Sequence, residues 1–351
     1  MVNEQNNTPI LEVKNLKVYF YTDDGVVKAV DGLDFEVAPG EILGLVGESG
    51  CGKSVTSFSI MQLVDSPGKI LDGEILFKGE NLLKKTEKEM DTIRGKQISM
   101  IFQQPQTSLD PVYTIANQIA EVFQTHSKIK KKEAEIKAVE LLKLVGIPDP
   151  IEKAKGYAHQ MSGGQAQRVM IAMALALQPE LLLADEPTTA LDVTIQAQIL
   201  DLLRGLQREF NTAMVLITHD LGVIAETAER VAIMYAGRIM EVADVETTFD
   251  SPLHPYTNGL IASVPVLGNV RDRLDTIQGN VPNLIDLPEG CRFADRCEKR
   301  EEYGLDICMR KEPELITLPT QKRHQVRCWL YQDDEELKHI APLKIQVEKE
   351  G

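Results

Sequence analysis

The run of residues 47–54 constrains the fold of this chain more than any other feature of its sequence. It reads Gly-Glu-Ser-Gly-Cys-Gly-Lys-Ser and matches the pattern G-x-x-x-x-G-K-S/T at every fixed position. A short apolar segment, residues 42–46, precedes it, and residues 53–64 can form a helix. A loop between a buried strand and a helix can cradle phosphate groups with its backbone N–H groups and the positive end of the helix dipole. We therefore expect a nucleotide-binding α/β fold.

The pattern also predicts a role for each residue of this phosphate loop. Lys53 is expected to reach the β- and γ-phosphates of a nucleotide, and the hydroxyl of Ser54 to ligate Mg²⁺. We interpret Cys51 as a small residue that the loop tolerates and not as a nucleophile. The backbone of the remaining loop would wrap the phosphates, and the residues concerned are Gly47, Ser49, Gly50, Cys51 and Gly52.

A second chemical element follows an apolar segment at residues 181–184. The segment ends in Asp185 and Glu186, which places two carboxyl groups beside the phosphate loop if both lie at the carboxyl edge of one sheet. Asp185 is suited to hold Mg²⁺, directly or through water. Glu186 is suited to accept a proton from a water molecule that attacks the γ-phosphate.

From residue 162 onward the sequence alternates between strand and helix patterns. We predict strands at 181–184, 213–217, 231–235 and 238–242, and helices at 165–176, 194–210 and 221–228. This alternation predicts a mainly parallel sheet that is covered on both faces. Residues 10–46 contain strand patterns, and residues 114–146 are predicted to be helical. The alternating pattern of strands and helices ends near residue 250, where we place a domain boundary.

Composition excludes several classes of protein. The chain has 351 residues, 43 % of them hydrophobic, and a formal net charge of −15, which disfavours both nucleic acid and anionic lipid as direct partners. The longest wholly apolar run, residues 169–177, is much shorter than the roughly 20 residues of a membrane-spanning helix. No secretory signal pattern is present at the start of the chain. We therefore expect a cytoplasmic location, and reduced thiols or metal ligands for the five cysteines.

Residues 161–165, Met-Ser-Gly-Gly-Gln, complete a series of motifs. Together with the phosphate loop and the Asp185-Glu186 pair, in this order, they resemble the signature of ABC-type ATPases. The resemblance covers residues 10 to about 250. It implies that Gln103 is the Q-loop glutamine, that Asp192 lies in the D-loop and that His219 is the switch histidine. It also implies an aromatic ring that stacks on adenine, for which Phe20 is the best candidate, with Tyr19 and Tyr21 as competitors.

The same resemblance implies how such a protein works. Two cassettes pair head to tail, and each ATP is sandwiched between the Lys53 loop of one and the signature turn of the other, which consists of Ser162, Gly163, Gly164 and Gln165. Gln103 would join Ser54 and Asp185 at the Mg²⁺ ion, and His219 would contact the γ-phosphate. The expected fold is an α/β cassette with a mainly parallel core sheet, an antiparallel β subdomain and a helical subdomain at about 104–160. Met161 and Gln104 depart mildly from the usual family pattern, and neither removes a phosphate ligand.

The remaining segment, residues 251–351, narrows the family. Its start at 251–257 and its cysteine-bearing segments resemble the C-terminal region of ATP-binding subunits of oligopeptide and dipeptide permeases. The spacing of the four cysteines leaves a zinc ion, an iron–sulfur cluster and free thiols all open, and His324 is a further candidate ligand. The family resemblance favours a 4Fe–4S cluster, with zinc as the alternative; the four residues are Cys291, Cys297, Cys308 and Cys328.

The leading hypothesis is therefore an ATP-hydrolysing subunit that drives peptide uptake from the cytoplasmic face of the cell membrane. The resemblance implies two transmembrane permease subunits as partners, a second cassette that is either a related subunit or a copy of this chain, and, indirectly, an extracytoplasmic peptide-binding protein. Glutathione and nickel complexes are alternative cargoes. A soluble ABC-type ATPase in nucleic-acid repair or translation is the alternative class, which the single cassette and the negative charge disfavour.

Overall fold

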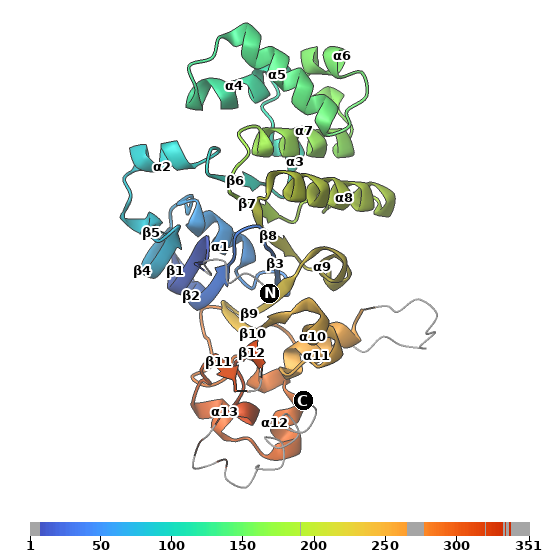
Figure 1. Ribbon diagram of the computed structural model, residues 1–351. Coiled ribbons are helices and arrows are strands. Elements are labelled where there is room, and N and C mark those ends of the chain that lie inside the picture. The colour runs from blue at the N-terminus through green and yellow to red at the C-terminus, as the bar shows by residue number, and fades with distance from the viewer. Residues whose placement is uncertain are drawn as a thin grey trace.

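The structure, a computed structural model, describes residues 8–189, 191–264, 277–319, 321–332, 334 and 337. Ala190, next to the expected D-loop residue Asp192, lies outside the described residues. The elements are stacked in three tiers, with helices α4–α6 at one end, the sheets in the middle and the C-terminal region at the other end (Figure 1). The nucleotide motifs belong to the middle tier and to the helices above it.

An eight-stranded sheet forms the centre of the molecule, in the order β11-β12-β10-β9-β3-β8-β7-β6. The five strands of this sheet that come earliest in the sequence are parallel to one another. This arrangement confirms the predicted mainly parallel α/β core. They are β3 (Ile42–Val46), β6 (Ile98–Ile101), β7 (Leu181–Asp185), β8 (Ala213–Thr218) and β9 (Arg230–Tyr235).

Both faces of this parallel sheet are buried. Every residue of β3 and β7 is buried, and successive side chains enter different cores because strand side chains alternate between the two faces. Leu181 and Leu183 enter one core, whereas Leu182 and Ala184 enter the other. The carboxyl ends of these strands are thereby fixed, and the phosphate loop and the Asp185-Glu186 pair begin at those ends.

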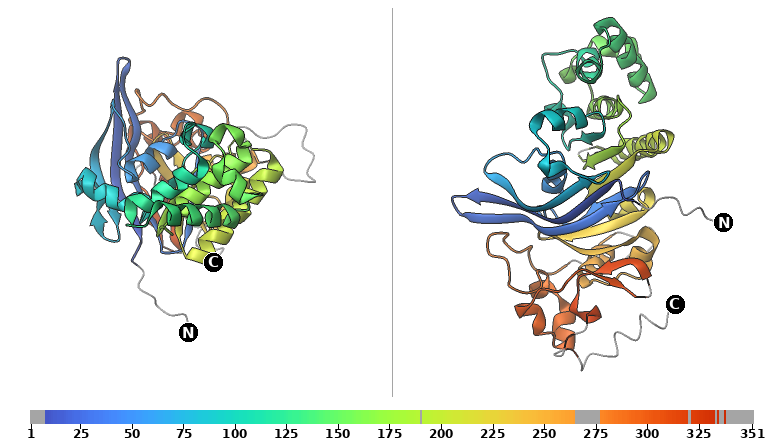
Figure 2. Two further views of the ribbon diagram at one scale, coloured as in Figure 1. Left: turned by 90° about the horizontal axis from the view of Figure 1, so that it is seen from above. Right: turned by 60° about the vertical axis from the view of Figure 1, so that its left-hand side comes forward.

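A second, antiparallel sheet packs on one of these cores. It has the order β2-β1-β4-β5, and its long strands extend beyond the core on one side (Figure 2). The strands are β1 (Leu11–Thr22), β2 (Gly25–Val37), β4 (Gly68–Phe77) and β5 (Glu80–Asn81).

Helix α1 (Lys53–Ile60) follows the phosphate loop and is shorter than the predicted 53–64. Met61 caps it, and Gln62 then takes a left-handed conformation with φ 51°, which a helix cannot continue through. The helices that cover the parallel sheet start and stop close to the predicted residues. They are α7 (Gly163–Leu175), α8 (Val193–Phe210) and α9 (Leu221–Thr227).

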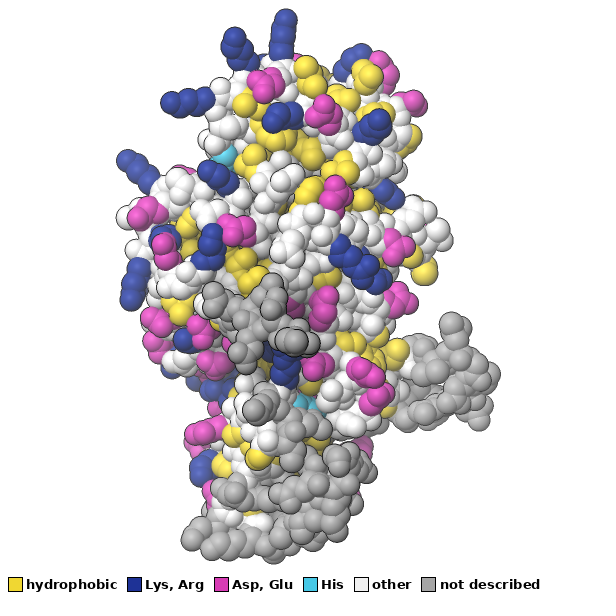
Figure 3. Space-filling view, viewed as in Figure 1, with side chains coloured by type: hydrophobic (Ala, Val, Ile, Leu, Met, Phe, Trp, Pro, Cys, Tyr) yellow, Lys and Arg dark blue, Asp and Glu magenta, His cyan; other side chains and the backbone are white. Residues whose placement is uncertain are grey.

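A separate group of helices forms the upper tier. It contains α4 (Ile115–His126), α5 (Lys131–Leu144) and α6 (Pro150–Lys155). Two short helices precede it in the sequence, α2 (Glu87–Ile93) and α3 (Pro105–Ser108), and α3 lies beside α7 below this tier (Figure 1). Hydrophobic side chains are visible on this tier (Figure 3), and four large ones are strongly exposed, namely Val112, Tyr113, Ile136 and Ile151. The tier therefore offers apolar surface at the end of the molecule that lies away from the C-terminal region (Figure 1).

The C-terminal region shares both a sheet and a core with the rest of the chain. Strand β12 (Gln321–Val326) pairs antiparallel with β10 (Arg238–Asp244), and β11 (Ile316–Leu318) extends the sheet further. Tyr256, Phe293 and Trp329 belong to the same buried cluster as the helical tier. The helices of this part are α10 (Val245–Asp250), α11 (Pro255–Ala262), α12 (Glu298–Tyr303) and α13 (Ile307–Arg310). The domain boundary near 250 stays a prediction.

A fully buried carboxylate anchors the start of this region. Glu241 on β10 accepts hydrogen bonds from the backbone N–H groups of Leu253 (2.9 Å) and His254 (2.8 Å), and its Oε1 lies 2.7 Å from Nε2 of His324. Nδ1 of His254 in turn accepts from the backbone N–H of Tyr256 at 3.0 Å and caps α11. Burial lowers the pKa of His254 to about 4, so this side chain is neutral near pH 7.

This buried cap makes the stability of the fold depend on pH. In the unfolded chain His254 takes up a proton near its ordinary pKa of 6.5, whereas in the folded chain it does so only near 4. The free energy of unfolding should therefore fall as pH decreases between these values, with His254 contributing up to about 3 kcal/mol. In urea unfolding at a series of pH values, His254→Asn should show a flatter pH dependence, because asparagine keeps an acceptor at the cap and does not titrate. His159→Asn, at an exposed histidine, is the control; an unchanged slope for His254→Asn would contradict the assignment.

Candidate nucleotide-binding site

The phosphate loop connects β3 to α1 along a path that admits no side chain at two of its glycines. A Cβ at Gly47 would lie 2.1 Å from the carbonyl oxygen of Met234, and one at Gly52 would lie 2.3 Å from that of Ala29. Gly52 also has φ +108°, in the region that disfavours residues with a side chain. The glycines at these two positions are therefore required by close contact with β9 and β2.

Lys53 lies inside the curl of this loop and is 5 % exposed. Its ammonium donates hydrogen bonds to the carbonyl oxygens of Gly47 (2.8 Å) and Glu48 (3.1 Å), and its Nζ lies 3.8 Å from Sγ of Cys51. The lysine charge is thus held at the centre of the loop, where phosphate oxygens would bind. Cys51 is buried, and burial raises the pKa of its thiol, which is consistent with a packing residue and not with a nucleophile.

Ser54 and Asp185 meet although 131 residues separate them. The Ser54 hydroxyl donates to Oδ1 of Asp185 at 3.1 Å, which brings two oxygen ligands together at the start of α1. Burial raises the pKa of the Asp185 carboxyl, and the neighbouring Glu186 carboxylate adds to the rise. A hydroxyl and a carboxylate are hard oxygen donors, so this pair fits Mg²⁺.

Glu186 is the centre of a polar cluster. Its Oε2 accepts hydrogen bonds from the amide of Gln103 (2.8 Å) and the hydroxyl of Thr189 (2.7 Å), and its Oε1 lies 3.4 Å from Nδ1 of His219. Its backbone has φ 44°, an uncommon value for this residue type, while its N–H donates to the carbonyl of Ile217. The strand end thus turns sharply, which aims the carboxylate at Gln103 and His219.

The charge state of Glu186 follows from these contacts. Burial by itself raises the pKa of this carboxyl, but the hydrogen bonds from Thr189 and His219, together with the charge of Lys53, hold it below its ordinary value. Glu186 is therefore ionised at neutral pH and able to accept a proton. Thr189 was not predicted as a site residue; its position three residues after Glu186, in the turn that leaves the strand, is the signal that points to it.

The signature turn forms the N-terminus of α7. Ser162 Oγ accepts from the N–H of Gln165 (3.3 Å), and the N–H of Ser162 donates to Oε1 of Gln165 (3.2 Å), a reciprocal cap. Asp192 caps α8 in a similar way by accepting from the N–H of Ile195 at 3.0 Å. Gly163 and Gly164 lie against Leu191 and Ile195, so the signature turn and the residues after the Glu186 cluster pack together.

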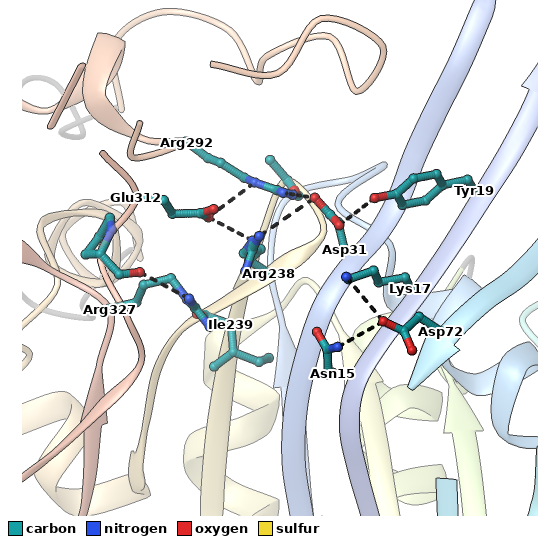
Figure 4. Close-up of polar contacts among 12 residues, drawn as sticks. Asn15, Lys17, Tyr19, Asp31, Asp72, Arg238, Ile239, Arg292, Glu312 and Arg327 are labelled. Carbon is teal, nitrogen blue, oxygen red and sulfur yellow. Dashed lines mark hydrogen bonds and ion pairs between the residues drawn. The ribbon is translucent and has the colours of Figure 1, made fainter. Parts of the chain in front are cut away.

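The three aromatic candidates on β1 lie in different surroundings. The Tyr19 hydroxyl donates to Oδ1 of Asp31 at 2.7 Å, within the network between β1, β2 and the C-terminal region (Figure 4). Tyr21 is 45 % exposed with the Lys69 ammonium over its ring. Phe20 lines a hollow of about 510 Å³ together with residues of α1 and with Phe102. Tyr19 is thus occupied by a structural bond, whereas Phe20 faces an open space.

The four C-terminal cysteines lie in one neighbourhood. Burial raises the pKa of every one of these thiols, to about 12 for Cys291 and Cys308, and the charges of the other three cysteines add to the rise at Cys328. Among the described residues, which include all four, no three His, Cys, Asp or Glu side chains are arranged to hold a metal ion. Nε2 of His324, the alternative ligand, lies against Glu241 instead.

The structure thus brings Lys53, Ser54, Gln103, Asp185, Glu186 and His219 together at the carboxyl edge of the sheet. The signature turn and Asp192 do not belong to this group of residues; their side chains form hydrogen bonds that cap the N-termini of α7 and α8. In the part of the chain that the structure describes, no helix is long and apolar enough to cross a bilayer.

Comparisons with known proteins agree with this geometry. The ABC transporter family model matches residues 30–189, and a model of the oligopeptide/dipeptide transporter C-terminal region matches residues 240–303. The chain is 52 % identical to the oligopeptide transport ATP-binding protein AppD of Bacillus subtilis (strain 168), over 93 % of this chain and 98 % of the relative. It is 49 % identical to the dipeptide transport ATP-binding protein DppD of the same organism, over 95 % and 97 %.

Solved structures show the same fold. The dimeric ATP-binding cassette MJ0796 bound to ADP and Pi superposes with a TM-score of 0.61 at 28 % identity, and the match covers 67 % of this chain and 98 % of that one. The nucleotide motifs, the fold and the similarity over nearly the whole length agree. This chain is therefore a member of the ABC transporter family of ATP-binding proteins, in the group that includes the oligopeptide and dipeptide transport proteins.

Proposed function

We propose that this chain is the ATP-hydrolysing subunit of an importer for oligopeptides or dipeptides. The observation that supports this best is the Glu186 cluster beside an intact phosphate loop. Relatives that match more than nine-tenths of the chain are named for oligopeptide or dipeptide transport. Family membership implies pairing of cassettes and permease partners.

The proposed chemistry follows from the residues at the edge of the sheet. The Lys53 ammonium and the loop N–H groups bind the phosphates, and Glu186 takes a proton from water. The oxygen of that water bonds to the γ-phosphorus while the bond from this phosphorus to the β–γ bridging oxygen breaks, releasing phosphate and ADP. Gln103 and His219 hold the Glu186 carboxylate in place, and His219 contacts the γ-phosphate.

Ser54 and Asp185 are the proposed ligands of Mg²⁺, with the amide oxygen of Gln103 as a third. The hydrogen bond between the Ser54 hydroxyl and Asp185 supports this assignment because both oxygens already lie together. The ion supplies positive charge that neutralises the phosphates during transfer.

A second cassette completes each site. Ser162, Gly163, Gly164 and Gln165 of one cassette, with Asp192 nearby, would cover the nucleotide bound to the Lys53 loop of the other, and Phe20 would stack on adenine. The partner cassette is a related subunit or a copy of this chain. The open hollow at Phe20 supports its assignment over Tyr19, whose hydroxyl is bonded to Asp31.

The helical tier is the proposed docking site for two transmembrane permease subunits. Its exposed apolar side chains, among them Val112, Tyr113 and Ile136, support this because such surface is typical of protein contacts. The protein would then lie at the cytoplasmic face of the membrane, and its charge of −15 suits the basic loops that permeases present there. The peptide would be captured outside by a separate binding protein.

The four C-terminal thiols are the proposed ligands of a 4Fe–4S cluster, with zinc as the alternative. The proposal rests on the presence of all four thiols in the C-terminal region, three of them buried. In the described part of the chain their side chains are not arranged around one ion, so the cluster would require them to move together. A bound metal would hold them as thiolates, which their raised pKa values disfavour in the metal-free protein.

Replacing Glu186 by glutamine should lower ATP turnover by about a hundredfold or more, because the amide cannot accept the proton. ATP binding should persist, so the variant should accumulate as a paired, ATP-bound form in size-exclusion chromatography. Glu226→Gln, at an exposed glutamate on α9, is the matched control and should hydrolyse ATP normally. Undiminished turnover by Glu186→Gln would remove this residue from the role of base.

The cargo is tested with the assembled importer in proteoliposomes that contain ATP. Labelled dipeptide or pentapeptide should accumulate with the unmodified chain, and Lys53→Ala should abolish the accumulation because the nucleotide is no longer held. Uptake of glutathione or of a nickel complex without uptake of either peptide would contradict the proposed cargo. Failure of the chain to copurify with the permeases would contradict an importer altogether.

Metal analysis after anaerobic purification tests the cysteine site. About four irons and four acid-labile sulfides per chain are expected, and a variant with serine at Cys297 and Cys308 should lose them. Cys51→Ser should keep them because that thiol lies in the phosphate loop. One zinc per chain without iron would contradict the 4Fe–4S cluster and support the zinc alternative. A chain that contains neither metal would contradict a metal site.

A further inference from the structure

An arginine of the C-terminal region reaches directly into the phosphate loop. The Arg296 guanidinium pairs with both carboxylate oxygens of Glu48, with Nη1–Oε2 at 2.7 Å and Nη2–Oε1 at 3.0 Å. Glu48 is the second residue of the loop, and 248 residues separate it from Arg296. This forked geometry is the strong form of a carboxylate–arginine contact.

Arg296 is held by several contacts besides the pair with Glu48. Its side chain is 6 % exposed, and its guanidinium lies over the rings of Tyr235 (5.7 Å) and Phe293 (5.9 Å). It also donates to the carbonyl of Gln278 at 2.8 Å. A guanidinium fixed by rings and a carbonyl loses little freedom when it binds the carboxylate, so the pair is worth more than an exposed salt bridge.

Two further contacts tie the same region to the loop. The hydroxyl oxygen of Tyr256 accepts from the backbone N–H of Glu48 at 3.0 Å. Arg292 donates to Asp31 (Figure 4) and to the carbonyl of Ala236. The next residue, Gly237, donates its N–H to the carbonyl of Cys51 in the loop at 2.9 Å. The C-terminal region therefore contacts the phosphate loop directly and also through the β9–β10 turn.

We propose that Arg296 is a positioning residue for ATP binding, which acts through Glu48. Glu48 brings a negative charge into the loop that must bind the negative phosphates, and its carbonyl is one of the two that hold the Lys53 ammonium. Arg296 compensates that charge and fixes the side chain on the side of the C-terminal region. Without Arg296, the partly buried carboxylate would be unpaired beside the nucleotide and would repel it.

If Arg296 has this role, its replacement should change ATP affinity and the KM for ATP but not kcat. Arg296→Met should weaken ATP affinity about tenfold, because one uncompensated charge acts on the phosphates at short range. The KM for ATP should rise by a similar factor, whereas kcat should change little because Glu186 and its partners are untouched. A purely structural role would lower the amount of active protein, and hence the apparent kcat, with no change in KM.

The experiment is a titration of the full-length chain with a fluorescent ATP analogue, together with steady-state hydrolysis. The double variant Glu48→Gln/Arg296→Met lacks the same arginine but carries no unpaired charge, so it should bind within about twofold of the unmodified protein. Arg296→Lys keeps the positive charge but cannot form the two parallel hydrogen bonds, so its ATP affinity should lie between those of Arg296→Met and the unmodified protein. Lys299→Met, which removes the exposed pair with Glu302 on α12, is the control and should bind normally.

Unchanged affinity in Arg296→Met would overturn the proposal. A double variant that binds as weakly as Arg296→Met would also overturn it, because the loss would then come from packing and not from the charge of Glu48. Should Arg296→Met not fold, the comparison of Arg296→Lys with Glu48→Gln/Arg296→Lys makes the same test, and equal weakening in both would contradict the role.

Discussion

The close packing of the phosphate loop against two neighbouring strands is the constraint on which the rest of this structure depends. Gly47 has no space for a side chain beside the carbonyl of Met234, and Gly52 has none beside that of Ala29. The loop is therefore fixed relative to β9 and β2 by the packing of its own backbone. The Lys53 ammonium donates to two loop carbonyls and is thereby held at the centre of the loop, where we propose that the phosphates bind.

Negative charge gathers around this loop, and each carboxylate has its own partner. Asp185 accepts from the Ser54 hydroxyl, Glu186 is held by Gln103, Thr189 and His219, and Glu48 is paired with Arg296. Apart from Thr189, these partners lie far along the chain from the carboxylates that they contact. The sheet brings the first two groups together, whereas the last comes from the C-terminal region. The site thus combines residues of the cassette with an arginine from its C-terminal extension.

Local sequence patterns predict the elements at the centre of the molecule well. The apolar runs of β3 and β7, the phosphate loop and the carboxyl pair that follows β7 were predicted because each depends on neighbours in the chain. The predicted helix at 53–64 is longer than α1, which ends at Ile60. The left-handed conformation of Gln62 that ends it cannot be recognised from the pattern of apolar residues. The pair between Arg296 and Glu48 had no sequence signal, since tertiary folding alone brings the two residues together. The spacing of the cysteines likewise did not distinguish a cluster from zinc.

The C-terminal region holds the phosphate loop in place through the pair between Arg296 and Glu48. Amide hydrogen exchange of a peptide covering residues 47–54 tests this most directly, because exchange reports the opening of the backbone itself. The amides of this peptide should exchange faster in Arg296→Met than in the unmodified chain, while those of a peptide covering β7 should exchange at the same rate in both. Equal exchange of the loop peptide in the two proteins would contradict the claim.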